Sequence, residues 1–232
     1  MTIRKHIPNT LTLCNLLSGC TGCVFALRGQ LDVTLACVLI SGCFDFLDGF
    51  SARLLKAYSD IGKELDSLAD LISFGLSPAL SLLAVYEAGE HALPQLGYAA
   101  LLLAAFSALR LAKFNLDERQ TKSFLGLPTP ACALLVIPLC VYGTASEGIA
   151  HNLIASEWFV PALSVALSLL LVSEIPMLSM KQFSPKLKAF IVGSVLLVAV
   201  TAVFVECSLS LWLTVMFTYY ILLNLGTLKR EI

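Results

Sequence analysis

Four aspartates occur at helical spacing within a short and largely apolar part of the chain. Asp45 and Asp48 are three residues apart, and Asp66 and Asp70 are four residues apart. Residues at these spacings share one face of an α-helix, so each pair presents two carboxylates in the same direction. A short connection between two antiparallel helices would turn the two acidic faces toward each other. We therefore predict that the four carboxylates share one site.

The chemistry of such a site follows from its charge. Carboxylates gathered in apolar surroundings repel one another and need compensating positive charge, and Arg53 supplies only one. Divalent cations such as Mg²⁺ and Mn²⁺ prefer oxygen ligands and combine carboxylates with substrate phosphates. Acidic residues at helix ends are also often simply solvated, but four at regular spacing favour a site. The pattern indicates a Mg²⁺ or Mn²⁺ centre.

Small residues accompany the aspartates at the same helical spacing. Gly49 and Ala52 follow the first acidic pair, and Gly62 precedes the second by four residues. Side chains this small leave room for a bulky ligand against the helix backbone. We therefore expect an open pocket beside the carboxylates.

The composition excludes a single soluble domain. Of the 232 residues, 58% are hydrophobic and 13% are charged, and the mean hydropathy is +0.86. Soluble domains contain about half apolar and about a quarter charged residues. The 15 basic and 16 acidic residues leave a net charge of −1, which also argues against nucleic acid as a partner. The composition predicts an integral membrane protein.

The apolar segments predict the helices that must position these side chains. A membrane span needs about 20 apolar residues, and the pattern predicts an all-α bundle of about eight transmembrane helices. The second and third segments are longer than a bilayer and polar where they meet, which indicates a helical hairpin projecting past the membrane surface. The eight segments are 8–27, 31–58, 61–86, 93–114, 129–144, 158–175, 189–205 and 209–225.

The basic residues predict how the bundle is oriented. With the N-terminus in the cytoplasm and eight alternating spans, 14 of the 15 Lys and Arg residues lie on the cytoplasmic side, and Arg28 lies outside. Loops on the cytoplasmic side carry such an excess of positive charge. We therefore expect both termini and the aspartate site at the cytoplasmic face. No linker divides the chain, so residues 1–232 are predicted to form one membrane-embedded domain.

The acidic segment resembles the signature of the CDP-alcohol phosphotransferase family. The signature reads D-x-x-D-G-x-x-A-R, eight residues, then G-x-x-x-D-x-x-x-D, and this chain matches every fixed position. The family displaces CMP from a CDP-linked lipid with an alcohol, in a membrane-embedded site with two divalent ions. The matching residues are Asp45, Asp48, Gly49, Ala52, Arg53, Gly62, Asp66 and Asp70.

The resemblance implies a role for each matching residue. Asp45, Asp48 and Asp66 would ligate metal, and Asp70 would combine metal contact with the role of general base. The CDP site would be lined by Gly49, Ala52, Arg53 and Gly62.

Three polar residues near the N-terminus recur at three-residue spacing. Asn9, Thr12 and Asn15 would share one face of the first helix, where they either face the nucleotide or form hydrogen bonds between helices. Both interpretations fit the pattern, and we include the three residues in the expected CDP site.

Other blocks resemble the phosphatidylserine synthase branch of the family. They are P-N-x-L-T-x-x-N from Pro8, R-L-A-K-F-N from Arg110 and G-L-P-x-P from Gly126. Lys113 stands where the branch often has Arg, which replaces a bidentate fork with a point charge. The resemblance implies CDP-diacylglycerol and L-serine as substrates, membrane lipids as surroundings and a homodimer.

The carboxylate of serine needs a cationic partner. We expect Arg110, Lys113 and Asn115 to bind the acceptor, within acceptor-side segments 107–130 and 173–188. The two basic residues equally suit a cytoplasmic helix end under the positive-inside rule. Two alternatives therefore stay open: the same chemistry with glycerol phosphate or inositol phosphate as acceptor, and a divalent-cation transporter.

Overall fold

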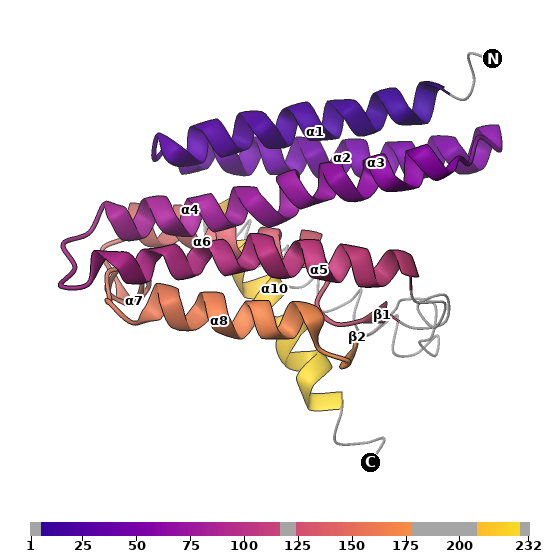
Figure 1. Ribbon diagram of the computed structural model, residues 1–232. Coiled ribbons are helices and arrows are strands. Elements are labelled where there is room, and N and C mark those ends of the chain that lie inside the picture. The colour runs from indigo at the N-terminus through magenta and orange to yellow at the C-terminus, as the bar shows by residue number, and fades with distance from the viewer. Residues whose placement is uncertain (1–5, 117–123, 178–207, 228–232) are drawn as a thin grey trace.

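The computed structural model describes residues 6–116, 124–177 and 208–227, and these are helical almost throughout (Figure 1). The only strands in these ranges are two residues long each, and they pair antiparallel between Phe124–Leu125 and Pro176–Met177. The helices are α1 (His6–Leu27), α2 (Leu31–Leu55), α3 (Asp60–Asp70), η2 (Leu71–Leu76), α4 (Ser77–Glu87), η3 (Pro94–Leu101), α5 (Leu102–Leu116), α6 (Thr129–Ala145), α7 (Ile149–Ile154), α8 (Phe159–Val172) and α10 (Leu209–Thr227); the strands are β1 (Phe124–Leu125) and β2 (Pro176–Met177).

Four continuous helices are long and apolar enough to cross a membrane, which indicates an integral membrane protein. They span His6–Leu27, Leu31–Leu55, Asp60–Glu87 and Pro94–Leu116, and they match the first four predicted segments within a few residues. Apolar helices shorter than 18 residues occupy Thr129–Ala145, Phe159–Val172 and Leu209–Asn224. The predicted segment 189–205 lies outside the described residues. The count of eight spans and the cytoplasmic position of both termini stay predictions.

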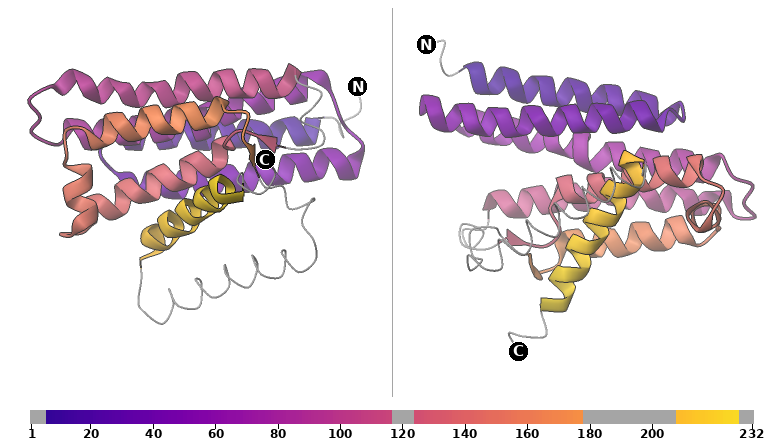
Figure 2. Two further views of the ribbon diagram at one scale, coloured as in Figure 1. Left: turned by 90° about the horizontal axis from the view of Figure 1, so that it is seen from below. Right: turned by 180° about the vertical axis from the view of Figure 1, so that it is seen from behind.

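Successive long helices run in opposite directions, so one end of the bundle collects several chain segments. In Figure 1 the start of α1, the α2–α3 turn, the end of α5 and the β1–β2 pair all lie toward the same side. The views in Figure 2 show α10 crossing the other helices at a steep angle. The aspartates of α2 and α3 lie in the half of the bundle built by α1, α2 and α3.

The core lies around η2, α4 and α6, where Phe74, Leu82 and Val136 respectively are fully buried. In contrast, Leu17 of α1 is 66% exposed and Leu54 of α2 is 70% exposed. Apolar side chains on the outside of a bundle are those that meet lipid in a membrane. The same helices therefore combine a packed inner face with an apolar outer face.

Close approach between α1 and η2 depends on a glycine. A Cβ on Gly19 would lie 2.8 Å from the Cα of Ser73 and would overlap its side chain. Small residues at helix interfaces let two backbones approach in this way in membrane proteins. This contact holds α1 against the continuation of α3.

Candidate active site

A tight turn brings the two acidic helices together. The backbone of Lys56 adopts a left-handed conformation with φ of 49°, and its N–H donates to the carbonyl O of Arg53 at 3.3 Å. Ser59 then caps α3, because its Oγ accepts a hydrogen bond from the backbone N–H of Gly62 at 3.0 Å. These local interactions end one helix and start the next within a few residues, so α3 folds back beside α2 as predicted.

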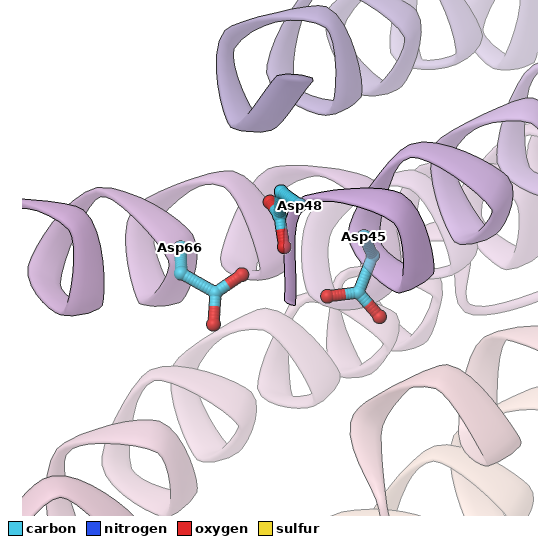
Figure 3. A group of neighbouring side chains, drawn as sticks. All are labelled: Asp45, Asp48 and Asp66. Atoms are coloured by element: carbon cyan, nitrogen blue, oxygen red, sulfur yellow. The ribbon is translucent and has the colours of Figure 1, made fainter. Parts of the chain in front are cut away.

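Three of the four aspartates converge. Asp45, Asp48 and Asp66 each offer a carboxylate oxygen, and these oxygens lie within 4.8 Å of one another. Figure 3 shows the three side chains directed into a shared space, Asp45 and Asp48 from α2 and Asp66 from α3. Asp48 is buried, and the other two are half-buried.

The donor set of this group fits a divalent cation. The Oδ1 atom of Asp66 is buried and has no hydrogen-bond partner among the described residues. Buried polar atoms normally have a partner, so an unpartnered carboxylate oxygen beside two other carboxylates calls for positive charge. Clustered carboxylate oxygens are the ligands that Mg²⁺ and Mn²⁺ prefer.

Asp70 lies one helical turn beyond Asp66 and outside this group of three. The side-chain amide of Asn15 donates from Nδ2 to Oδ1 of Asp70 at 3.3 Å, and its Oδ1 accepts a hydrogen bond from Oγ of Ser73 at 2.7 Å. Asn15 is fully buried, so this pair of hydrogen bonds determines how its amide is oriented. The π-helical segment η2 begins directly after Asp70, and such segments often occur at functional sites.

The polar face of α1 is directed at the acidic helices. Thr12 donates from Oγ1 to Oδ2 of Asp48 at 2.6 Å. Asn9 lies beside Gly62, where an added Cβ would lie 3.1 Å from Oδ1 of Asn9. With Asn15 on Asp70, the three polar residues of α1 that were predicted for the CDP site all lie against α2 or α3. The structure thus brings Asn9, Thr12 and Asn15 to the site, and Thr12 and Asn15 each form a hydrogen bond with an aspartate.

A cavity of about 220 Å³ opens between α1, α2 and α3, next to the carboxylates. Five of the seven residues predicted for the CDP site line it, whereas Asn15 and Arg53 do not. Arg53 is exposed, and its Nε donates to the carbonyl O of Gly49 in its own helix at 2.9 Å. The lining residues are Pro8, Asn9, Thr12, Asp48, Gly49, Ala52, Ala57, Tyr58, Ser59, Gly62, Lys63 and Asp66.

Several lining residues were missed by the sequence analysis. Tyr58, Ser59 and Lys63 come from the α2–α3 turn and the first turn of α3. Tyr58 and Ser59 fall in the eight-residue spacer of the signature and Lys63 follows its glycine, positions where the signature specifies no residue type. The only available signal was the position of Lys63 directly after Gly62.

The three predicted acceptor residues occupy different surroundings on α5. Arg110 is only 8% exposed, donates from Nη1 to Oγ1 of Thr129 at 3.4 Å and interacts electrostatically with Asp70. Its Nε is buried without a partner among the described residues. Lys113 is exposed, and Asn115 donates from Nδ2 to Oγ of Ser67 on α3 at 2.9 Å. Only Arg110 is thus directed into the bundle toward an aspartate.

The predicted acceptor-side segments are described in part. Segment 107–130 is described except for residues 117–123, and segment 173–188 is described up to residue 177. Gly126, the first residue of the G-L-P-x-P block before α6, adopts φ of 77°, and its N–H donates to the carbonyl O of Ile175 at 2.9 Å. This contact joins the two segments next to the β1–β2 pair.

Known proteins match most of this chain. The family model for CDP-alcohol phosphatidyltransferases matches residues 5–220. A CDP-diacylglycerol–serine O-phosphatidyltransferase of Mycobacterium leprae is 33% identical over 90% of this chain and 71% of its own length. An enzyme with the same name from Helicobacter pylori is 34% identical over 86% of this chain and 81% of its own length. Another from Methanocaldococcus jannaschii is 33% identical over 75% of this chain and 75% of its own length. The family predicted from the aspartate signature is confirmed: this chain belongs to the CDP-alcohol phosphatidyltransferases.

Proposed function

We propose that this chain transfers the phosphatidyl group of CDP-diacylglycerol to the hydroxyl of L-serine and releases CMP. The observation that carries the proposal is the group of three carboxylates from α2 and α3 beside a cavity of about 220 Å³. The choice of serine is supported by relatives that are named for this reaction and match most of the chain. The proposal extends to residues 1–232 as one membrane-embedded domain.

The aspartates divide into two roles in this proposal. Asp45, Asp48 and Asp66, with Asp70 at the edge, would hold two Mg²⁺ or Mn²⁺ ions, which neutralise charge on the diphosphate and on the departing CMP. Asp70 also accepts the proton of the serine hydroxyl as general base. Support for this second role comes from Asn15, which orients the Asp70 carboxylate by a hydrogen bond at 3.3 Å.

The bond changes follow from these positions. The serine oxygen forms a bond to the β-phosphorus, which carries the diacylglycerol, and the bond from that phosphorus to the CMP oxygen breaks. The proton of the serine hydroxyl passes to the carboxylate of Asp70. CMP leaves with the electron pair of the broken bond.

We assign the nucleotide to the cavity between α1, α2 and α3. Asn9, Thr12, Gly49, Ala52 and Gly62 line it, and the two glycines leave room for a ligand against the backbone. Arg53 and Asn15 lie just outside the lining. Arg53 would turn from the Gly49 carbonyl to a phosphate oxygen, and Asn15 would act through Asp70.

The acceptor is assigned to α5. Arg110 would bind the serine carboxylate, because it is buried near Asp70 and its Nε has no partner among the described residues. Lys113 and Asn115 would contribute at the outer end of the same helix. The charge distribution of the sequence supports eight spans with this site at the cytoplasmic membrane face, and we propose a homodimer surrounded by membrane lipids.

A screen of acceptors tests the proposed reaction. The purified protein in detergent, given CDP-diacylglycerol and Mn²⁺, should release CMP with L-serine and not with glycerol 3-phosphate or inositol phosphate. Release with glycerol 3-phosphate and none with serine would assign a different acceptor. Metal uptake into liposomes without lipid turnover would favour a cation transporter instead.

Removal of a metal ligand tests the centre itself. Asp66→Asn should weaken Mn²⁺-dependent CMP binding by more than about 100-fold. Loss of a residue that only supports a metal ligand already lowers metal affinity by about 10- to 100-fold, and loss of a ligand itself should cost more. Calorimetry with CMP, with and without EDTA, measures this. Asp60→Asn is the matched control, because Asp60 is an exposed acidic residue in the first turn of the same helix. Equal CMP affinity in both variants would contradict a metal centre at Asp66.

A further inference from the structure

Lys63 contributes a basic side chain to the cavity that we assign to the nucleotide. It lies in the first turn of α3 directly after Gly62 and lines the same cavity as Asp48 and Asp66. Among the described lining residues it is the only one with a basic side chain. Arg53, the other basic residue of this hairpin considered for phosphate binding, does not line the cavity.

The ammonium group of Lys63 has a neutral partner in the structure. Its Nζ donates to the backbone carbonyl O of Asn115 at 3.0 Å, and no carboxylate of the described residues forms an ion pair with it. Asn115 lies in the last turn of α5, where backbone carbonyls lack partners within the helix. The bond is exposed to solvent, so it is readily exchanged for a stronger one.

A diphosphate would provide that stronger bond. Hydrogen bonds from an ammonium to a phosphate oxygen are charge-assisted and stronger than those to a neutral carbonyl. Lysine has a flexible stem and three rotatable donors, so its ammonium moves without a change in the backbone. Asp48 and Asp66 on the same cavity wall carry negative charge that opposes a diphosphate, and Lys63 adds positive charge beside them, in addition to that of the proposed metal ions.

We propose that Lys63 is a substrate-binding residue for the phosphates of the cytidine nucleotide. Its ammonium leaves the Asn115 carbonyl and donates to a phosphate oxygen when the cavity is occupied. This inference rests on the proposed function of the same site and adds a residue that the signature does not specify. In the structure, the hydrogen bond from Lys63 to Asn115 connects the cavity wall to the end of α5, the helix that carries Arg110.

Binding of CMP and of cytidine to the same variants tests the inference. Lys63→Met should weaken Mn²⁺-dependent CMP binding about tenfold, which corresponds to about 1.4 kcal/mol, and leave cytidine binding unchanged. Lys63→Arg should restore CMP binding to within about threefold, because it keeps the charge. Lys56→Asn is the matched control: it removes a lysine seven residues earlier, and asparagine tolerates the left-handed backbone found there.

Kinetics separates substrate binding from a merely structural role. In Lys63→Met the KM for CDP-diacylglycerol should rise about tenfold while the KM for serine stays as in the wild type. Lys63→Gln carries the same test if the methionine variant does not fold. Wild-type CMP affinity in the neutral variants, or equal losses for CMP and cytidine, would overturn the inference.

The acceptor assay keeps the two proposals distinguishable. CMP binding is measured without any acceptor, so a protein that releases no CMP with serine would refute the proposed reaction while the Lys63 result still stood. Conversely, serine-dependent turnover with unchanged CMP affinity in Lys63→Met would refute only the role of Lys63.

Discussion

The α2–α3 hairpin and the end of α5 both carry candidate site residues that were selected by their spacing in the sequence. Only in the hairpin does this spacing predict correctly which side chains lie together. Asp45, Asp48 and Asp66 converge within 4.8 Å, as the helical pattern predicts. On α5, Arg110 and Lys113 are also three residues apart, yet Arg110 is buried and Lys113 is exposed. A tight turn sets how the faces of α2 and α3 meet, whereas the rotation of α5 about its axis depends on its packing against η2 and α8.

The second difference concerns hydrogen bonding. In the hairpin, one oxygen of Asp66 has no hydrogen-bond partner within the part of the chain that the structure describes. On α5, the side chain of Asn115 bonds to Ser67 and its backbone carbonyl accepts from Lys63. Buried polar atoms normally have a hydrogen-bond partner, so an atom without one needs an explanation, and a bound ligand is one such explanation. Arg110 resembles the aspartates in this respect, because its buried Nε has no hydrogen-bond partner among residues 6–116, 124–177 and 208–227.

The largest expected effect is on Asp70, which ends α3 and interacts electrostatically with Arg110 of α5. Asp70→Asn should lower kcat by roughly 10²- to 10⁴-fold, the range for loss of a general base, and leave Mn²⁺-dependent CMP binding largely intact. CMP release with serine, together with CMP calorimetry, measures both properties. A wild-type rate in this variant would remove Asp70 as the base.

The two basic residues of α5 provide the next test. Arg110→Met should raise the KM for serine by about 10- to 100-fold, since a buried charged hydrogen bond is lost, and Lys113→Met should raise it by only about two- to threefold. Arg110→Lys keeps the charge and covers the case in which the methionine variant does not fold. If Lys113→Met had the larger effect, the assignment from burial would be wrong.

An effect smaller than that of Arg110→Met is expected for Thr12 on α1. Thr12→Val removes the hydroxyl that donates to Oδ2 of Asp48 at 2.6 Å and keeps nearly the same shape. We expect the Mn²⁺ concentration for half-maximal activity to rise about three- to tenfold, because the orientation of one metal ligand is relaxed. Thr12→Ser retains the hydroxyl and should resemble the wild type. Equal behaviour of the valine and serine variants would show that the hydroxyl does not matter.

Local sequence features predicted much of the fold. The predicted segments 8–27 and 31–58 correspond to α1 (His6–Leu27) and α2 (Leu31–Leu55), because long apolar runs can only be helices in a membrane. The π-helical η2, the 3₁₀ segment η3 and the β1–β2 pair were not predicted. The β1–β2 pair joins segments about 50 residues apart, and no apolar pattern marks either helical irregularity.

The sequence by itself determined the family, the membrane helices and the two acidic helix faces, because each depends on spacing along a continuous helix. Only the tertiary structure decided that Asn15 bonds Asp70, that Arg110 is directed inward, and that Lys63 lies in the wall of the cavity. These contacts join helices far apart in the chain. Their formation depends on how each helix is rotated and packed against the others, which no local pattern of residues specifies.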